Sequence, residues 1–232
     1  MIIRSVALFF ATLLVFLASD AVQAADYPKV TFKYSQYFDS TCAELTKLPI
    51  DAAAVTELEN RLDSFREHWR KEAPQLLGAT VILIKAPFQF RETRAALSVC
   101  SGFPSMSLPL TINMRFYLKS LRGEKATSMT IFSSVVFHEL LHRYTADRIE
   151  TLPGKTTPLL KKYRDEPQIV QSHLHVLSII KAVYGKLGRE KDLEEVTAFE
   201  QTLRSAAGFK RTREIIEKEG ADKFISEIRT SR

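Results

Sequence analysis

The sequence has no apolar stretch long enough to cross a membrane, no internal repeat and no low-complexity tract. A membrane-spanning helix needs about 20 consecutive apolar residues, whereas the longest run, residues 6–18, is only 13 residues long. Glycine is sparse, with 8 residues in 232, which excludes a collagen. The composition, 45% hydrophobic and 26% charged, also excludes a mostly disordered chain and a coiled coil. At about 150 residues per domain, a single globular domain remains.

The first 24 residues have the three parts of a secretory signal peptide. Arg4 gives a short positive region, residues 6–18 are apolar and uncharged, and Val22 and Ala24 place small residues before a cleavage site. This pattern predicts a signal peptide over 1–24 and a secreted or periplasmic mature chain, with an uncleaved anchor as the alternative. We expect residues 25–232 to form one domain, with a helix-plus-sheet lobe over 25–127 and a helical lobe over 128–232.

Cysteine is scarce: Cys42 and Cys100 are the only two, so only one intrachain pairing exists. An exported chain enters an oxidising environment, which favours a disulfide bond over the alternative of two buried free thiols. The bond would close a loop of about 59 residues and contribute on the order of 4 kcal/mol to stability.

Acidic residues are few between residues 85 and 125, where seven basic side chains are opposed only by Glu92 and Glu124. The whole chain has a formal net charge of +6. A basic face of this kind could favour an anionic cell-envelope surface; the alternative is an ordinary solvated sheet face. Aromatic residues do not alternate with the basic ones as they do in nucleic-acid-binding surfaces, so we expect no nucleic-acid partner.

Apolar periodicity predicts an α+β fold in which strands and one helix come first and helices alone follow. An apolar stripe repeating every three or four residues predicts a helix over 52–73, which Pro74 ends. The predicted strands are 30–34, 80–84, 88–99 and 108–118. The predicted later helices are 128–146, 166–187, 193–206 and 212–228, the last interrupted near Gly220.

The chemistry of the chain is concentrated in the sequence His138-Glu139-Leu140-Leu141-His142. On a helix, residues four apart point the same way, and two neutral imidazoles at that spacing can bind one Zn²⁺. Glu139 directly follows His138 and can reach a metal-bound water without being a ligand. The pattern therefore predicts zinc on His138 and His142, with Glu139 as the catalytic carboxylate. The alternative is a pair of buried histidines hydrogen-bonded within a core.

This five-residue motif, together with the predicted order of elements, resembles the zincin class of zinc-dependent metallopeptidases. The resemblance implies a zincin-like α+β fold: a small sheet with a backing helix, then an active-site helix, then a helical C-terminal lobe. It also implies Zn²⁺ as the cofactor and a peptide or protein as the substrate.

A catalytic zinc needs a third protein ligand, and the glycine-containing extension found in metzincins does not follow His142. Zincins with a glutamate ligand take it from a later helix, so the resemblance points to Glu166, 24 residues after His142. The rivals are His173 and, closer to the motif, Asp147 or Glu150.

His173 lies seven residues after Glu166, on the same face of the predicted helix. We therefore expect a catalytic role for His173, either in orienting a zinc ligand or in donating a hydrogen bond in the transition state. Tyr163 and Tyr184 are further candidate donors. His175 lies on another face, and we expect it to pack in the core.

The implied function is that of an exported zinc metallopeptidase. Zinc would activate a water, and Glu139, as general base, would take the proton of that water and pass it to the leaving amine. The substrate could pair with the sheet edge, for which strand 108–118 is the expected candidate. The alternatives are an exported zinc-binding cell-envelope amidase, a non-catalytic binding protein on a zincin-like fold, and a metal-free structural protein.

Overall fold

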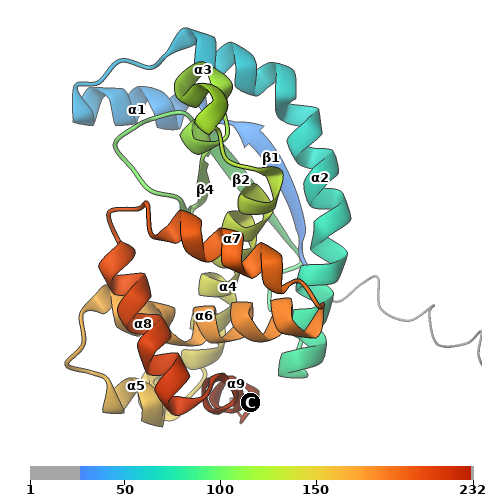
Figure 1. The fold of residues 1–232 in the computed structure, drawn as a ribbon, viewed down its shortest axis with the longest axis vertical. Coiled ribbons are helices and arrows are strands. Elements are labelled where there is room, and N and C mark those ends of the chain that lie inside the picture. The colour runs from blue at the N-terminus through green and yellow to red at the C-terminus, as the bar shows by residue number, and fades with distance from the viewer. Residues whose placement is uncertain (1–26, 231–232) are drawn as a thin grey trace, which may run out of the picture.

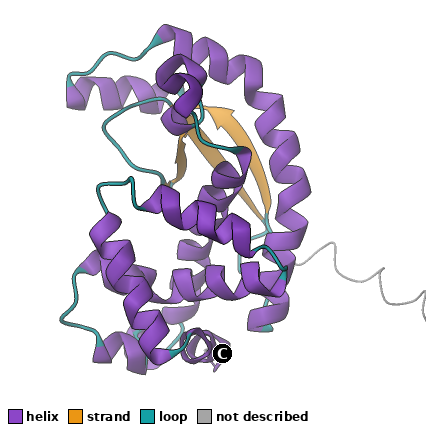
Figure 2. Cartoon of the chain, in the orientation of Figure 1, coloured by secondary structure: helices purple, strands orange, loops and turns teal. Residues whose placement is uncertain are grey.

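The structure, a computed structural model, describes residues 27–230 and has the predicted α+β architecture (Figure 1, Figure 2). The predicted signal peptide, residues 1–24, lies outside the described residues. The strands are β1 (Lys29–Tyr34), β2 (Glu92–Ser98), β3 (Met106–Ser107) and β4 (Leu110–Asn113). The helices are α1 (Gln36–Thr46), α2 (Ala52–Ile84), α3 (Lys119–Arg122), α4 (Met129–Ile149), α5 (Pro158–Lys162), α6 (Gln168–Lys186), α7 (Glu190–Glu200), α8 (Ala206–Glu219) and α9 (Ala221–Thr230), with short 3₁₀ turns η1 (Met114–Phe116), η2 (Gly123–Lys125) and η3 (Pro153–Lys155). None of the described helices is both long and apolar enough to cross a membrane.

Helix α2 begins where the sequence predicts but continues past Pro74 to Ile84. The side chain of Asp51 caps it by accepting a hydrogen bond from the backbone N–H of Ala54. The expected strand over 80–84 is therefore wrong, because these residues form the last turns of the helix. Residues 73, 76, 77, 80 and 84 are all buried, and this spacing is helical. Their packing offsets the hydrogen bond that Pro74 removes.

The four strands form one mixed sheet in the order β1-β2-β4-β3. Strands β1, β2 and β4 run parallel, and the two-residue β3 pairs antiparallel with β4. The expected strand 108–118 is shorter, ending at Asn113, whose side chain accepts from the N–H of Arg115 and starts η1. Since β4 lies between β2 and β3, it is not an edge, and the expectation of substrate pairing along it is wrong. The edge strand next to β4 is β3.

A cluster of aromatic rings joins the sheet to its two covering helices. Phe32 of β1 contacts Trp69 of α2 and Phe132 of α4, with ring centroids 6.3 and 5.6 Å apart. Phe65 and Tyr117 pack against the same Phe132 ring. All five side chains are buried. This core places α4, the helix with the two motif histidines, on the same side of the sheet as α2.

The C-terminal part is helical, as predicted, with α6 packed against α4, α8 and α9. The element bounds differ from the predicted ones: α6 begins at Gln168, not 166, and α7 ends at Glu200, not 206. The predicted interruption near Gly220 is confirmed. Gly220 has a φ of 87° between α8 and α9, a value that favours glycine.

The predicted disulfide bond between Cys42 and Cys100 is confirmed, with Cα atoms 6.2 Å apart. It ties α1, a helix that the sequence analysis did not predict, to the segment that follows β2. The buried carboxylate of Asp39 lies beside the bond, where it accepts hydrogen bonds from Ser98 Oγ and from the N–H groups of Val99 and Cys100. The disulfide and these hydrogen bonds together fix the loop that leads to β3.

Candidate metal centre

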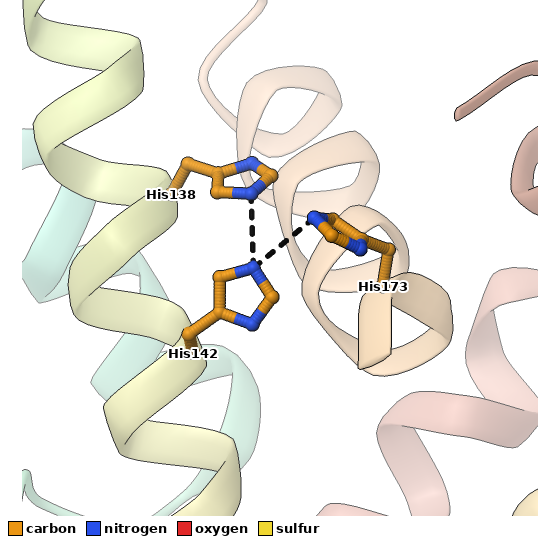
Figure 3. Close-up of side chains that lie close together, drawn as sticks. All are labelled: His138, His142 and His173. Carbon is orange, nitrogen blue, oxygen red and sulfur yellow. Dashed lines mark hydrogen bonds between the residues drawn. The ribbon is translucent and has the colours of Figure 1, made fainter. Parts of the chain in front are cut away.

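Helix α4 holds His138 and His142 one turn apart (Figure 3). Ser128 caps its N-terminus by accepting from the N–H of Ile131, and no glycine or proline interrupts the helix before Ile149. The Nε2 atoms of the two histidines are 3.0 Å apart. Both residues are half-buried, and most of the side chains around them on α4 are buried.

Helix α6 brings His173 to the same place, from the opposite side in Figure 3. Its Nε2 lies 3.2 Å from Nε2 of His142. Its other ring nitrogen, Nδ1, is 2.6 Å from the carbonyl oxygen of Ile169. A carbonyl oxygen only accepts, so Nδ1 is the protonated nitrogen and Nε2 presents its lone pair to the other two histidines. A backbone carbonyl behind a histidine is a common way to orient a metal ligand.

The three histidines form a group whose ligand atoms all lie within 4.8 Å of one another. Two nitrogens bound to one tetrahedral zinc at 2.0–2.1 Å would be about 3.3 Å apart, close to the two shortest separations found here. Hydrogen bonding alone does not satisfy the group. The single Nε2 of His142 faces two other Nε2 atoms, and a neutral ring can donate from that nitrogen only once. The residues therefore fit a metal ion.

Burial keeps the three rings neutral, which is the form that binds metals. Burial, followed by the neighbouring histidines, holds the pKa of His138 well below its usual value. Burial and the charge of His173 lower the pKa of His142 to about 3. Burial also lowers the pKa of His173, although the hydrogen bond to Ile169 opposes this.

Glu139 follows His138 on α4 and is buried. Burial raises the pKa of its carboxyl group to about 8. The hydroxyl of Tyr117 is fully buried nearby, and burial followed by the charge of Glu139 raises its pKa. Glu139 is not among the clustered ligand atoms, so its carboxyl group is available for a role other than binding the metal.

Glu166, the sequence-based first choice for the third ligand, is not brought to the histidines. It lies before the start of α6, and its carboxylate forms an ion pair with Arg211 of α8, with Oε1 2.5 Å from Nη2. This pairing lowers the pKa of Glu166. The structure instead brings His173, which the sequence analysis named as a rival ligand, next to the two motif histidines.

The other residues considered as ligands or donors lie outside the group of three histidines or have other partners. Asp147 lies 3.9 Å from Arg143, and Glu150 is at the C-terminal end of α4. Tyr163 donates a hydrogen bond to Glu219. Two further residues point into the core: Tyr184 is fully buried three turns beyond His173, and buried His175 pairs with Glu227 at 2.9 Å.

Helix α8 supplies two neighbours of the centre that the sequence analysis missed. The ring of Phe209 packs edge-on against His173 and His138, at centroid distances of 4.9 and 6.0 Å. Arg213, one turn later, is close enough for its charge to lower the pKa of His138, after burial and the other histidines. Its Nη2 pairs with Glu200 of α7 at 2.5 Å. No local sequence pattern indicates these contacts, because they depend on how α8 packs on α6.

Comparison with known proteins does not assign the chain to a family: no family model, curated protein or solved structure matches it.

Proposed function

We propose that the protein is an exported zinc metallopeptidase in which His138, His142 and His173 hold the metal. The observation that carries the proposal is the convergence of three Nε2 atoms within 4.8 Å, with two of the separations close to those that one zinc ion requires. Glu139 is the residue after the first of them, on the same helix. The confirmed disulfide bond supports an oxidising location.

The arrangement of elements supports a zincin-like fold. A small sheet backed by α2 precedes α4, which holds the two motif histidines, and helices alone follow (Figure 2). The third histidine comes from the helical part, on α6. A ligand set drawn from two packed helices is held by the core on both sides, which keeps the three rings at fixed separations.

The residues of the proposed centre would have different roles in peptide hydrolysis. Zinc, when bound, would polarise the substrate carbonyl and lower the pKa of a water. Glu139 would accept the proton of the attacking water and return it to the leaving nitrogen, because it follows His138 on α4 and is not among the clustered ligand atoms. The positive charge of a bound zinc would favour the ionised form of its carboxyl group, against the effect of burial. The hydrogen bond from Nδ1 of His173 to the carbonyl oxygen of Ile169 would keep the Nε2 lone pair directed at the centre.

Strand β3 is the edge that an extended substrate would use. It is last in the sheet order, pairs on one side only, and lies in contact with α4. An edge strand leaves backbone N–H and C=O groups free on its outer side, and a peptide can pair with them whatever its sequence.

The test is the zinc content of the mature chain, residues 25–232, purified after export without chelator. We expect about one zinc per chain in the parent and in Glu166→Ala, and much less in His142→Ala and His173→Ala. Zinc loss in Glu166→Ala with retention in His173→Ala would restore the glutamate as the ligand. A parent chain that binds no zinc after zinc is added would refute the metal centre.

Hydrolysis is tested with Glu139→Gln, which keeps the size of the side chain and removes its basicity. We expect normal zinc content and a loss of peptide cleavage of at least a hundredfold, the usual contribution of a general base. Equal cleavage by parent and variant would refute the role of Glu139. A zinc-loaded parent that leaves peptides intact but cleaves amides of cell-wall peptides would favour the amidase alternative.

A further inference from the structure

Three arginines interact electrostatically, two from consecutive short elements after β4 and one from the turn before α8. Arg115 is in η1, just after β4; Arg122 is the last residue of α3; and Arg204 is in the turn between α7 and α8. Arg122 and Arg204 are exposed, and Arg115 is partly buried. Like charges do not gather without a cause, because each raises the energy of the others.

Aromatic contacts hold the three segments together. The guanidinium of Arg122 lies over the ring of Phe116, 5.6 Å from its centroid. That ring packs edge-on against Phe199 of α7, with centroids 5.3 Å apart. Arg115 is the residue before Phe116 and is fixed by a hydrogen bond of 2.9 Å to the carbonyl oxygen of Ser101. Helix α7 ends at Glu200, four residues before Arg204, and the charge of Arg204 acts on Arg115.

No acid neutralises this group within the part of the chain that the structure describes. None of the three arginines takes part in an ion pair there, and the acids closest to them in sequence have other partners. Glu124 lies near Lys119, Glu200 pairs with Arg213, and Glu195 accepts from Ser128. Burial, followed by the charges of Arg122 and Arg204, lowers the pKa of Arg115, so the three charges act on one another.

The chain links the arginines to the centre through the turn before α8. Arg204 is five residues before Phe209, whose ring contacts His173 and His138. Five residues of chain span at most about 18 Å, and an extended peptide advances about 3.3 Å per residue. An acidic side chain within about five residues of the scissile bond could therefore reach Arg204.

We propose that Arg115, Arg122 and Arg204 bind acidic side chains of the substrate, so that the enzyme selects acidic peptides. The inference rests on the proposed peptidase function and names its substrate class. Arginine suits the role because its planar guanidinium donates two parallel hydrogen bonds to a carboxylate.

The test measures binding separately from catalysis. The mature chain with Glu139→Gln, loaded with zinc, is titrated against a fluorescent peptide rich in glutamate and against the same peptide with glutamine in its place. We expect tighter binding of the acidic peptide. Adding Arg122→Gln and Arg204→Gln together is expected to weaken binding of the acidic peptide about tenfold, since each exposed ion pair contributes up to about fivefold. Binding of the neutral peptide should stay within about twofold.

Arg94→Gln is the matched control, because it removes one exposed positive charge from β2, and that side chain lies on the opposite sheet face from Phe32 and α4. An equal loss in this control, or equal losses for both peptides, would overturn the inference. The inference would also be overturned if the double variant lost binding to anionic phospholipid vesicles while the parent bound the two peptides equally. That result would indicate a surface-binding patch. If selective binding is found but the parent cleaves neither peptide, the arginine site stands and the peptidase proposal fails.

Discussion

Replacing Gly208 with alanine tests how closely α8 must approach α6 to form the metal centre. A Cβ atom at this position would lie 2.7 and 2.8 Å from Cγ2 and Cγ1 of Ile169. Carbon atoms in contact prefer separations of about 3.5–4.0 Å, and the branched side chain of Ile169 has little room to turn. The residue after Gly208 packs on His173, and the carbonyl of Ile169 accepts the hydrogen bond of that histidine. Any shift that relieves the contact therefore moves parts of the ligand sphere.

The expected change in the free energy of unfolding of Gly208→Ala follows from two opposing effects. Overpacking by one carbon in a close contact costs about 1–3 kcal/mol, and alanine gains up to about 1 kcal/mol over glycine in a helix. We expect the free energy of unfolding of Gly208→Ala to fall by about 1–2 kcal/mol. Gly185→Ala on α6 is the matched control, because no atom lies within 4 Å of its added Cβ. It should gain about 0.5–1 kcal/mol.

Urea denaturation and a chelator competition for zinc provide the two measurements. Gly208→Ala should be less stable than the parent and should bind zinc more weakly, whereas Gly185→Ala should bind zinc as the parent does. If the two variants gain equal stability and bind zinc equally, α8 does not press on Ile169 as described, and the argument for a tightly packed centre fails.

Two further predictions concern stability away from the centre. Burial alone would raise the pKa of Glu57, but hydrogen bonds from the N–H groups of Ser120 and Lys119 outweigh it and lower the pKa to about 2. The stabilisation by these hydrogen bonds is then complete above about pH 4.5 and disappears as the pH falls towards 2. Glu57→Gln should therefore lower the free energy of unfolding by about 2 kcal/mol at pH 7, after allowance for partial exposure, and by almost nothing at pH 2. Urea titrations at both pH values decide this. Replacing Cys42 and Cys100 with serine should cost on the order of 4 kcal/mol at pH 7, because the bond closes a loop with a sequence separation of 58; an unchanged urea midpoint would refute this.

The sequence predicts those parts of the fold that local patterns determine. The motif helix and the single disulfide follow from spacing and cysteine count. The continuation of α2 through Pro74 could not be predicted in that way, because a proline ordinarily ends a helix. Here the loss is offset by the burial of residues 76, 77, 80 and 84 against other elements, and that burial is a property of the tertiary structure. Strand β3, two residues long, is too short for any alternation to show.

The choice of the third ligand could not be predicted from local patterns either. Glu166 and His173 are seven residues apart, so as long as both were assigned to one helix, they shared a face and periodicity could not separate them. The structure separates them by starting α6 at Gln168, which leaves Glu166 outside the helix and next to Arg211 of α8. That pairing depends on a contact between residues 45 apart in the sequence.

The change of the proposed third ligand from Glu166 to His173 also changes the charge of the proposed centre. Three neutral imidazoles add no negative charge, whereas a glutamate would cancel one of the two positive charges of the metal. A centre with its full charge would add to the positive charge of the three arginines, which form no ion pair with any residue that the structure describes, so we expect acidic peptides to bind more readily than neutral ones.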